Sequence, residues 1–542
     1  MNGTPGAGMI PGTTEGGGGR RIMVEQAVRA VVEAIVAKAP GGRSQAVLHC
    51  RADAGGTSLS GGYSAGGHLP SLWTVIRPLT EAVRQECGRE SVSIELRTGP
   101  SGEYRLVVCD DAVRRVTGTG RGFRVILDPG HRVSRPGMHQ EAGTAGPAGD
   151  PELAVDRFHT YLERRAAILG RREELPPPAT PAAIDAAERE LGRRLPADLR
   201  ALYLIADGDC VGLEPRYLFQ GSTWLSLGHL VTARDGYGAT EPPWSGWGLE
   251  WDAVIFDADP AETVRRCAGH PGWLRFASGE DGNYLAVDTA PARNGRPGQV
   301  IRTGRDHHRG PSHVADSVTS LLGHYLELLD RGAYAYEEED DYLELLEPDR
   351  APTRRESLDG IPDEIPPTLQ AVRVNDATGP VELSRLATAH RLRSVRLAGS
   401  ATADLSPVRE LPVEALNTTA EGAGLAPLAG HPHLASLGLR STTPVDLTPL
   451  RSVPRLHGLD LAEAEVADLD VLSGLEGLRY LALTRAQWGT LLNEGGAPPA
   501  LAAGCLTDSD STLDEALALA ARLGLETGAA FRLTGSLETD GG

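Results

Sequence analysis

Leucines recur at a fixed spacing in the last third of the chain and predict a stack of similar coils. The pattern begins at Leu383 and returns at Leu405, Leu425, Leu447 and Leu469, with a period of 22 residues except for one copy that is two residues shorter. A fixed period of this length is typical of solenoids, which mostly serve as binding surfaces. We therefore predict a solenoid over residues 361–484 and favour a binding protein over an enzyme.

The first part of the chain has a mixed pattern. Apolar residues at helical spacing predict helices over Val24–Ile35 and Leu72–Val83, and alternating residues predict strands over Val92–Leu96, Tyr104–Val108 and Phe123–Leu127. The first two of these strands flank a Gly/Pro turn and are expected to form a hairpin. Residues 21–128 thus read as a small α+β domain, in which no known family is recognised.

The segments between and beyond the predicted domains differ in composition. Residues 1–20 are rich in glycine and are expected to be disordered, residues 129–179 form a linker with one helix, and Glu337–Asp341 opens an acidic linker over 333–360. A helical cap is predicted over 485–530 and a disordered tail over 531–542. The fold class is therefore multidomain α+β.

Charge and cysteine usage restrict the partners. The net charge is −20, and Lys38 is the one lysine among basic residues that are otherwise arginine, which suggests a GC-rich bacterial genome. A strongly acidic chain repels nucleic acid and anionic membranes and favours a basic protein partner, although charge of this kind also serves solubility alone. Six scattered cysteines without a CxxC pair, no secretory signal and no membrane-length apolar run indicate a cytoplasmic protein.

Three motifs that suggest chemistry have simpler explanations. Gly118–Gly122 lacks the lysine of a phosphate-binding loop and leads into a strand, which favours a turn. His307, His308 and His313 have no cysteine nearby and read as an exposed loop. Glu280 and Asp281 are adjacent in a turn, whereas an acid–base pair needs carboxylates on opposite sides of a substrate. We expect no catalytic residues, metal, cofactor or small-molecule substrate, and keep an enzymatic activity in residues 21–128 as an alternative.

The middle of the chain carries a recognisable order of motifs. A helix over Pro181–Leu191 is followed by a helix ending at Asp207-Gly208, by strands Trp273–Ala277 and Asn283–Asp288 around a glycine turn, and by a closing helix over Val314–Leu329. Over residues 180–332 this order resembles the SUKH superfamily, the Smi/Knr-type domain. The resemblance implies an α+β fold with a sheet packed on helices and no catalytic activity. Many bacterial members are immunity proteins of polymorphic toxin systems, and a fungal relative is a scaffold in cell-wall regulation.

The resemblance also selects candidate residues. Asp207, Asp281 and Asp288 match family positions and, together with the neighbouring Glu280, are candidate partner contacts. The other matching positions are expected to be structural, since glycines permit turns and aromatic residues fill the sheet–helix core. They are Gly208, Trp273, Phe276 and Gly282.

The repeats resemble the bacterial leucine-rich repeats of the internalin type. Asp404, Asp446 and Asp468 each precede the leucine that opens a coil and are expected to accept hydrogen bonds from the next turn. The inward asparagine of that family is replaced here by three other residues, Ser400, Thr442 and Ala464, which predicts a weaker stack.

Small residues dominate the outward positions of the short strands, which we expect on a concave face. These positions are Ser394, Arg396, Ser436, Gly438, Gly458, Asp460, Tyr480 and Ala482. Arg396 and Tyr480 are the candidate binding anchors of this face, and a spacer role for the repeats is the alternative.

Together these patterns predict a non-enzymatic protein that binds other proteins. The first hypothesis is an immunity protein that neutralises a basic toxin domain by direct docking. The alternative is an intracellular scaffold or regulator with several partners, whose linked modules would gain avidity.

Overall fold

A computed structural model describes most of the chain in two compact units. The described residues are 17–39, 45–53, 56–64, 68–109, 115–119, 121–212, 214–233, 254–307, 309–337, 342–346, 358–361, 363–377, 381–399, 404–420, 424–526 and 531–537. The first unit comprises residues 1–129, 460–462 and 466–542, and the second comprises 130–459 and 463–465. The chain passes from one unit to the other within strand β19 (Gly458–Val466).

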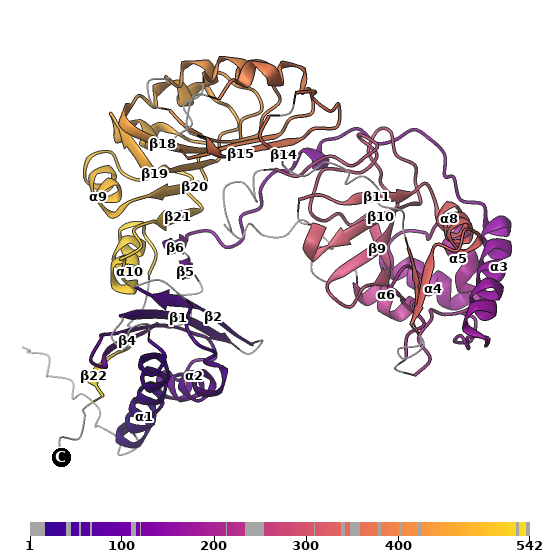
Figure 1. The fold of residues 1–542 in the computed structure, drawn as a ribbon, viewed down its shortest axis with the longest axis horizontal. Helices are drawn as coiled ribbons and strands as arrows, with labels where there is room; N and C mark the ends of the chain where they lie inside the picture. The colour runs from indigo at the N-terminus through magenta and orange to yellow at the C-terminus, as the bar shows by residue number, and fades with distance from the viewer. Residues whose placement is uncertain are drawn as a thin grey trace, which may run out of the picture. The chain divides into compact units, whose positions relative to one another are not determined.

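The first unit contains a five-stranded sheet with two helices packed on one face (Figure 1). Its strand order is β2-β1-β3-β4-β22, with bounds Gly56–Tyr63, Ala46–Asp53, Val92–Thr98, Glu103–Cys109 and Phe531–Ser536. Helices α1 (Gly17–Val36) and α2 (Trp73–Cys87) share one apolar core with this sheet. Both predicted helices and the β3–β4 hairpin are confirmed, whereas β1 and β2 were missed. Residues 17–20, expected to be disordered, belong to α1, and residues 1–16 lie outside the described residues.

Elsewhere in this unit, strands from residues 116–126 pair with strands from residues 480–506. Strands β20 (Tyr480–Leu483), β21 (Ala503–Leu506), β6 (Gly122–Ile126) and β5 (Val116–Thr119) are neighbours in that order. Gly118–Gly122, which contains one residue outside the described range, joins the antiparallel β5 and β6, so these glycines lie at a hairpin turn as predicted.

The prediction of a purely helical cap over 485–530 was wrong in part. Helices α9 (Arg485–Glu494) and α10 (Leu513–Arg522) are present, but β21 lies between them in the sequence. Trp488 at α9 donates its indole N–H to the carbonyl of Cys505 in β21 at 2.9 Å. This strand belongs to the sheet because its backbone groups pair with both β20 and β6.

The expected disordered tail is also partly ordered. Residues 531–536 form β22, which pairs antiparallel with β4 along its whole length, and Leu533 is buried in the core. This short strand is stable here because β4 supplies backbone partners along one side of it and Leu533 packs into the core. The domain predicted at 21–128 therefore shares one sheet with the end of the chain, while residues 538–542 lie outside the described residues.

The second unit begins with an antiparallel sheet that is covered by helices on one face (Figure 1). The strand order is β11-β10-β9-β8-β7, with bounds Ser312–Ala315, Gln299–Gly304, Asn283–Asp288, Trp273–Ser278 and Thr223–Trp224. The helices are α3 (Pro151–Leu169), α4 (Pro181–Leu191), α5 (Ala197–Tyr203), α6 (Leu227–Ala233) and α8 (Val318–Asp330). The predicted order of helices and strands is confirmed, except that Val314 lies in β11 and the closing helix begins at Val318. Gly192 ends α4 in the left-handed conformation, with φ 71°.

Two segments expected in linkers are part of this fold. Helix α3 contributes Phe158 and Tyr161, both fully buried, to the core between the helices and the sheet. Strands β12 (Tyr334–Glu337) and β13 (Tyr342–Leu345) form a hairpin whose Leu343 and Leu345 join the same core. The linker predictions failed because long apolar side chains in both segments find partners on the domain. Residues 338–341, which hold most of the acidic run, lie outside the described residues.

The other face of this sheet is covered by chain without regular structure. Trp273 and Ile301 point from the sheet into a small cluster with Ala258, Val264 and Cys267. Trp273 is therefore buried on the face opposite the helices, whereas Phe276 lies in the sheet–helix core that was expected for both residues. Successive strand residues face opposite sides, which explains the difference.

The coils follow in the same unit. Strands β14 (Leu358–Asp359), β15 (Ala371–Ala377), β16 (Ser394–Gly399), β17 (Ala415–Thr419) and β18 (Ser436–Val445) are parallel neighbours. Short 3₁₀ helices between the strands carry the first leucines of each repeat, for example Leu383–Thr388 and Thr448–Ser452. Of the leucines that set the period, Leu383, Leu405, Leu425 and Leu447 are buried and Leu469 is half-buried, which agrees with the repeat register predicted from the sequence.

The predicted aspartate caps are present. Asp404, Asp446 and Asp468 accept hydrogen bonds from the amides of Ser406, Thr448 and Asp470 at 2.8–2.9 Å. These bonds lower the pKa of Asp404 and of Asp446 below the ordinary aspartate value.

The prediction for the inward polar position was wrong at one coil. Thr442 is exposed, and the preceding Ser441 is buried instead, with its hydroxyl bonded to the carbonyl of Thr443 at 2.6 Å. Ala464 is buried, and Ser400 lies outside the described residues.

Candidate interaction surfaces

The aspartate pair after α5 has structural roles in the described fold. Asp207 accepts a hydrogen bond from the amide of Leu227 at 2.8 Å and thereby holds the start of α6. Gly208 has φ 93°, and a Cβ there would lie 2.8 Å from the carbonyl oxygen of Trp224, so only glycine fits. Asp209, which the sequence analysis missed, is fully buried and accepts a bond from the amide of Leu218 at 2.9 Å. Its burial raises its pKa to about 6.

Asp288 was predicted as a partner contact, and this prediction was wrong because the side chain is fully buried. Its carboxylate accepts hydrogen bonds from the amide of Ala290 at 2.9 Å and from the side chain of Gln299 at 3.0 Å. Gln299 also donates to the carbonyl of Thr263. Asp288 and Gln299 therefore tie the strand ends to the irregular chain that covers the face of the sheet opposite the helices. Burial raises the pKa of Asp288 to about 7.

The buried Asp288 predicts a pH dependence of stability. A carboxyl whose pKa is higher in the folded than in the unfolded protein binds more protons when folded, so its contribution is greatest below about pH 4 and is lost as pH rises towards 7. We expect this loss to be on the order of 2–4 kcal/mol. Urea unfolding between pH 4 and 8 should show a steeper decline in the wild type than in Asp288→Asn, which cannot ionise. Parallel pH curves would exclude the assignment.

An exposed acidic turn joins strands β8 and β9. We use this name for Glu280 and Asp281 in the turn together with Asp306 beside it. Asp281 accepts bonds from the backbone and side-chain N–H groups of Asn283 at 2.8 and 2.9 Å, and the same side chain donates to Asp306 at 2.7 Å. These bonds lower the pKa of Asp281 and of Asp306, so both stay ionised. Glu280 is exposed and Gly282 has φ 92°, as a tight turn requires.

The coil residues predicted as binding anchors lie in different surroundings. Tyr480 is buried in the first unit, beside Cys505 on the neighbouring strand, and burial raises its pKa well above the ordinary tyrosine value. The prediction that Tyr480 is an exposed anchor was therefore wrong. Arg396 is half-buried on the outward side of β16 and lies directly opposite Arg373 on β15.

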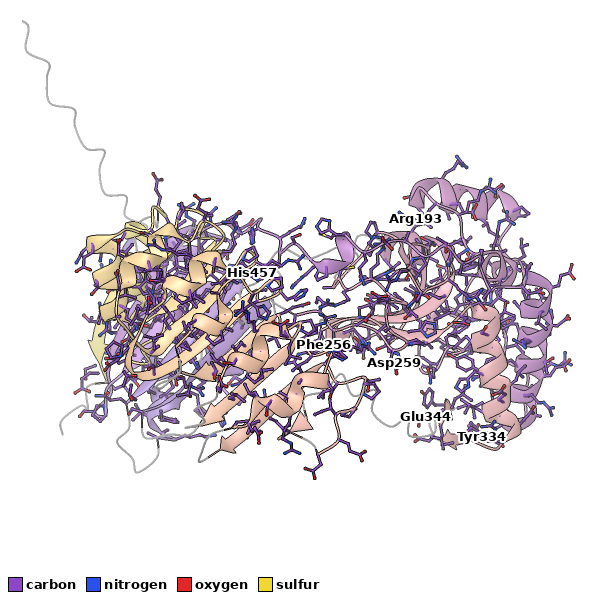
Figure 2. The ribbon with its side chains drawn as sticks, turned by 90° about the horizontal axis from the view of Figure 1, so that it is seen from above. Arg193, Phe256, Asp259, Tyr334, Glu344 and His457 are labelled. Carbon is purple, nitrogen blue, oxygen red and sulfur yellow. The ribbon has the colours of Figure 1, made fainter. Side chains whose placement is uncertain are left out.

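The outward face of the first coils is occupied by a segment of the preceding domain. Val254 and Phe256 pack on Ala371, Ala415 and Ala435 and form a small buried cluster with them. Figure 2 labels Phe256 of this cluster. Alanines at these positions leave room for the incoming chain. These three alanines were not among the small outward residues predicted from the sequence.

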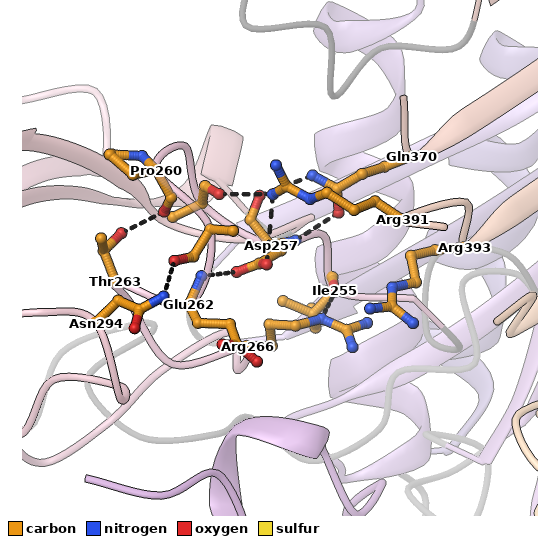
Figure 3. Close-up of polar contacts among 12 residues, drawn as sticks. Ile255, Asp257, Pro260, Glu262, Thr263, Arg266, Asn294, Gln370, Arg391 and Arg393 are labelled. Carbon is orange, nitrogen blue, oxygen red and sulfur yellow. Dashed lines mark hydrogen bonds and ion pairs between the residues drawn. The ribbon is translucent and has the colours of Figure 1, made fainter. Parts of the chain in front are cut away.

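Polar contacts flank this cluster (Figure 3). The side-chain amide of Gln370 accepts a hydrogen bond from the amide of Asp257 at 2.8 Å and donates to the carbonyl of Asp257 at 2.9 Å. Arg391 donates to the carbonyl of Ala258 at 2.9 Å and lies 3.4 Å from the carboxylate of Asp257. The side chains of Gln370 and Arg391 thus bind backbone N–H and C=O groups of the segment, as the backbone of a neighbouring β-strand would.

A buried ion pair completes the contact. The guanidinium of Arg266 lies 2.7 Å from the carboxylate of Glu414, and both side chains are 7% exposed. Arg266 also donates to the carbonyl of Ile255 at 2.7 Å, which folds the segment back on itself (Figure 3). Arg393 lies 3.7 Å from the other oxygen of Glu414, so one carboxylate serves two arginines.

Comparison with protein families identifies the middle domain. Residues 178–324 match the SMI1 / KNR4 family (SUKH-1). This part of the chain is a SUKH domain. The matched range lies almost wholly within the predicted range 180–332, and it contains the acidic turn and Asp207.

Two fungal proteins are similar to part of this chain. The cell wall biosynthesis/cell cycle regulator smi1 of Schizosaccharomyces pombe is 31% identical over 173 residues, 31% of this chain and 34% of that protein. A KNR4/SMI1 homolog of Yarrowia lipolytica is 26% identical over 268 residues, 40% of this chain and 37% of that protein. The chain thus spans about a third of the length of these relatives.

Among solved structures, an internalin (inlF) from Listeria monocytogenes is similar to part of the chain. The similarity covers 23% of this chain and 39% of the internalin, with 21% sequence identity and a TM-score of 0.20. At this score the likeness carries no argument, and the description of the coils depends on their own geometry.

None of the described helices is both long and apolar enough to cross a membrane.

Proposed function

We propose that this chain is a non-enzymatic regulator that binds a protein partner through its SUKH domain. The match of residues 178–324 to the SMI1 / KNR4 family carries the proposal, and the relatives are named as regulators of the cell wall and of glucan synthesis. Those cellular roles belong to the relatives. For this chain we propose the general role of a cytoplasmic scaffold, with the coils as leucine-rich repeats of the internalin type.

The acidic turn is the partner contact in this proposal. Of the contact residues predicted in this domain, Glu280 and Asp281 are exposed, whereas Asp207 is half-buried and Asp288 is fully buried. The turn presents its charges on a backbone fixed by bonds from Gly279 to Asn283 at 2.9 Å and from Arg305 to Gly282 at 3.0 Å. A rigid contact surface loses little conformational entropy on binding.

Affinity capture with the full chain as bait tests this role. Glu280→Gln with Asp306→Asn removes two charges and retains Asp281, which holds the turn. We expect the double variant to capture less of the partners than the wild type does. Glu410→Gln is the control, because Glu410 is exposed on a coil at a distance in the sequence from the domain. Equal capture by all three proteins would rule out the acidic turn as the contact.

Toxin neutralisation remains a second proposal, and the charge of the chain favours it. A net charge of −20 attracts a basic toxin domain at long range and speeds association. The comparisons favour the regulator, since the relative in Schizosaccharomyces pombe is named a regulator of cell wall biosynthesis and the cell cycle.

Salt dependence tests the charge argument. If the partner is basic and binds at the acidic turn, raising the salt concentration should slow association by tenfold or more, on the order expected for steered encounters, and change dissociation little. Stopped-flow association rates of the purified pair from about 0.05 to 0.5 M salt provide the measurement, with the Debye length falling below about 8 Å across this range. An acidic partner, or rates independent of salt, would exclude toxin capture by charge and leave the regulator.

A further inference from the structure

The contact between the SUKH domain and the coils uses equivalent positions of successive repeats. We call Gln370, Arg393, Glu414 and Ala435 the docking row. The carbonyl of each of the first three accepts hydrogen bonds from two consecutive amides of the next coil at 2.7–3.0 Å, for example Gln370 from Arg393 and Ser394. Each residue of the docking row directly precedes a strand, so the four residues lie at the same position of successive coils.

The segment that meets this row, Val254–Cys267, lies between the coils and the SUKH sheet. Its Ala258, Val264 and Cys267 pack on the face of the sheet opposite the helices. Its Val254 and Phe256 pack on the coil alanines. Both clusters are small, so neither alone gives the segment a large apolar core.

A third strip of chain lies against the same segment. Arg265 donates to the carbonyls of Gly137 and Gln140 at 2.9 and 2.7 Å. A Cβ on Gly137 would lie 2.7 Å from backbone atoms of Arg266, so residue 137 must be glycine for this approach.

The polar groups at the docking row are specific for this segment. Gln370 pairs with both backbone groups of Asp257, and Glu414 receives the guanidinium of Arg266 in a buried position. A buried ion pair adds little net stability because desolvation offsets the attraction, but removing one partner leaves an unpaired buried charge and is strongly unfavourable. The pair therefore selects the docked arrangement over alternatives.

We propose that the coils act as an intramolecular clamp whose ligand is the segment Val254–Cys267 of the same chain. When it is docked, the segment covers Trp273 on the face of the SUKH sheet opposite the helices, and it also covers the alanines of the coils. Released from the coils, the segment exposes Val254, Phe256 and the alanines that they cover, while hydrogen bonds at Thr263 and Arg265 keep it on the SUKH domain. The clamp thus controls when this apolar surface is available to a partner. The proposal concerns the coils and does not depend on the acidic turn.

Hydrogen–deuterium exchange of the full chain tests the clamp through the amide of Asp257, which donates to Gln370. In Glu414→Gln, we expect exchange in residues 254–258 to rise by at least about tenfold, because Arg266 loses its charged partner. Gln370→Ala removes the direct acceptor and should have a similar effect. Amides of β9, in the middle of the SUKH sheet, should keep their protection in both variants.

Glu410→Gln is the matched control, since it makes the same chemical change at an exposed glutamate four residues away and should leave exchange unchanged. Two results would overturn the proposal. One is unchanged exchange at 254–258 in both Glu414→Gln and Gln370→Ala. The other is equal loss of protection in 254–258 and β9, which would make the contact a part of the domain fold rather than a releasable clamp.

Discussion

Replacing Trp224 by alanine is expected to lower the free energy of unfolding of the second unit by about 3–5 kcal/mol. Trp224 is fully buried, and its ring centroid lies 5.1 Å from that of Tyr203, 5.7 Å from Phe158 and 5.9 Å from Phe219. These residues come from three helical or loop segments and β7, so the indole joins parts of the core that are distant in the sequence. Its removal would leave a cavity that rigid neighbours cannot fill.

The measurement is urea unfolding followed by far-ultraviolet circular dichroism. Trp73→Ala is the control, because Trp73 is 56% exposed on α2 and undergoes the same chemical change. We expect the control to shift stability by less than about 1 kcal/mol. Similar losses in the two variants would contradict the core described for the SUKH domain.

Replacing Leu416 by alanine is expected to cost about 2–5 kcal/mol. Leu416 is buried on β17, where the strand register places it between Val395 of β16 and Leu437 of β18. The lost methyl groups would leave a cavity between coils that share a continuous core, so the effect should extend to neighbouring repeats.

Leu204→Ala provides the comparison, since Leu204 is 40% exposed at the end of α5. Thermal unfolding of both variants should show a clearly lower midpoint for Leu416→Ala. If the two midpoints coincide, the inward register of the coils is incorrect.

The clamp and the stability of the coils are connected. The docking row lies at the start of the same strands whose leucines fill the coil interior, so a loosened stack would also move Gln370 and Glu414. Exchange at residues 254–258 in Leu416→Ala should therefore rise as well, although the polar contacts themselves are intact.

Sequence patterns located the local elements because local physics determines them. The 22-residue leucine period set the coil register, and glycine and aspartate positions set several turns and caps, including Gly192, Gly282 and Asp446. The order of motifs in residues 180–332 was sufficient to recognise the SUKH domain, since helices and strands with strong apolar periodicity form where the pattern indicates.

The tertiary structure alone decided which of these residues meet. Asp288 and Tyr480 have polar groups typical of exposed contacts, but burial depends on partners that a pattern of single positions does not reveal. Strand β22 and the β12–β13 hairpin looked like linker or tail because short strands carry a weak signal and acquire stability only from a neighbouring edge or core.

The contact of Val254–Cys267 with the coils also could not be predicted from the pattern of single positions. Alanines at residues 371, 415 and 435 indicated only that little side-chain volume was present. That the space is filled by Phe256, and that Glu414 is paired with Arg266 from 148 positions earlier, follows from the path of the chain between two domains. Sequence periodicity determined the strongly periodic elements of this protein, whereas long-range packing determined the short edge strands and which surfaces remain open.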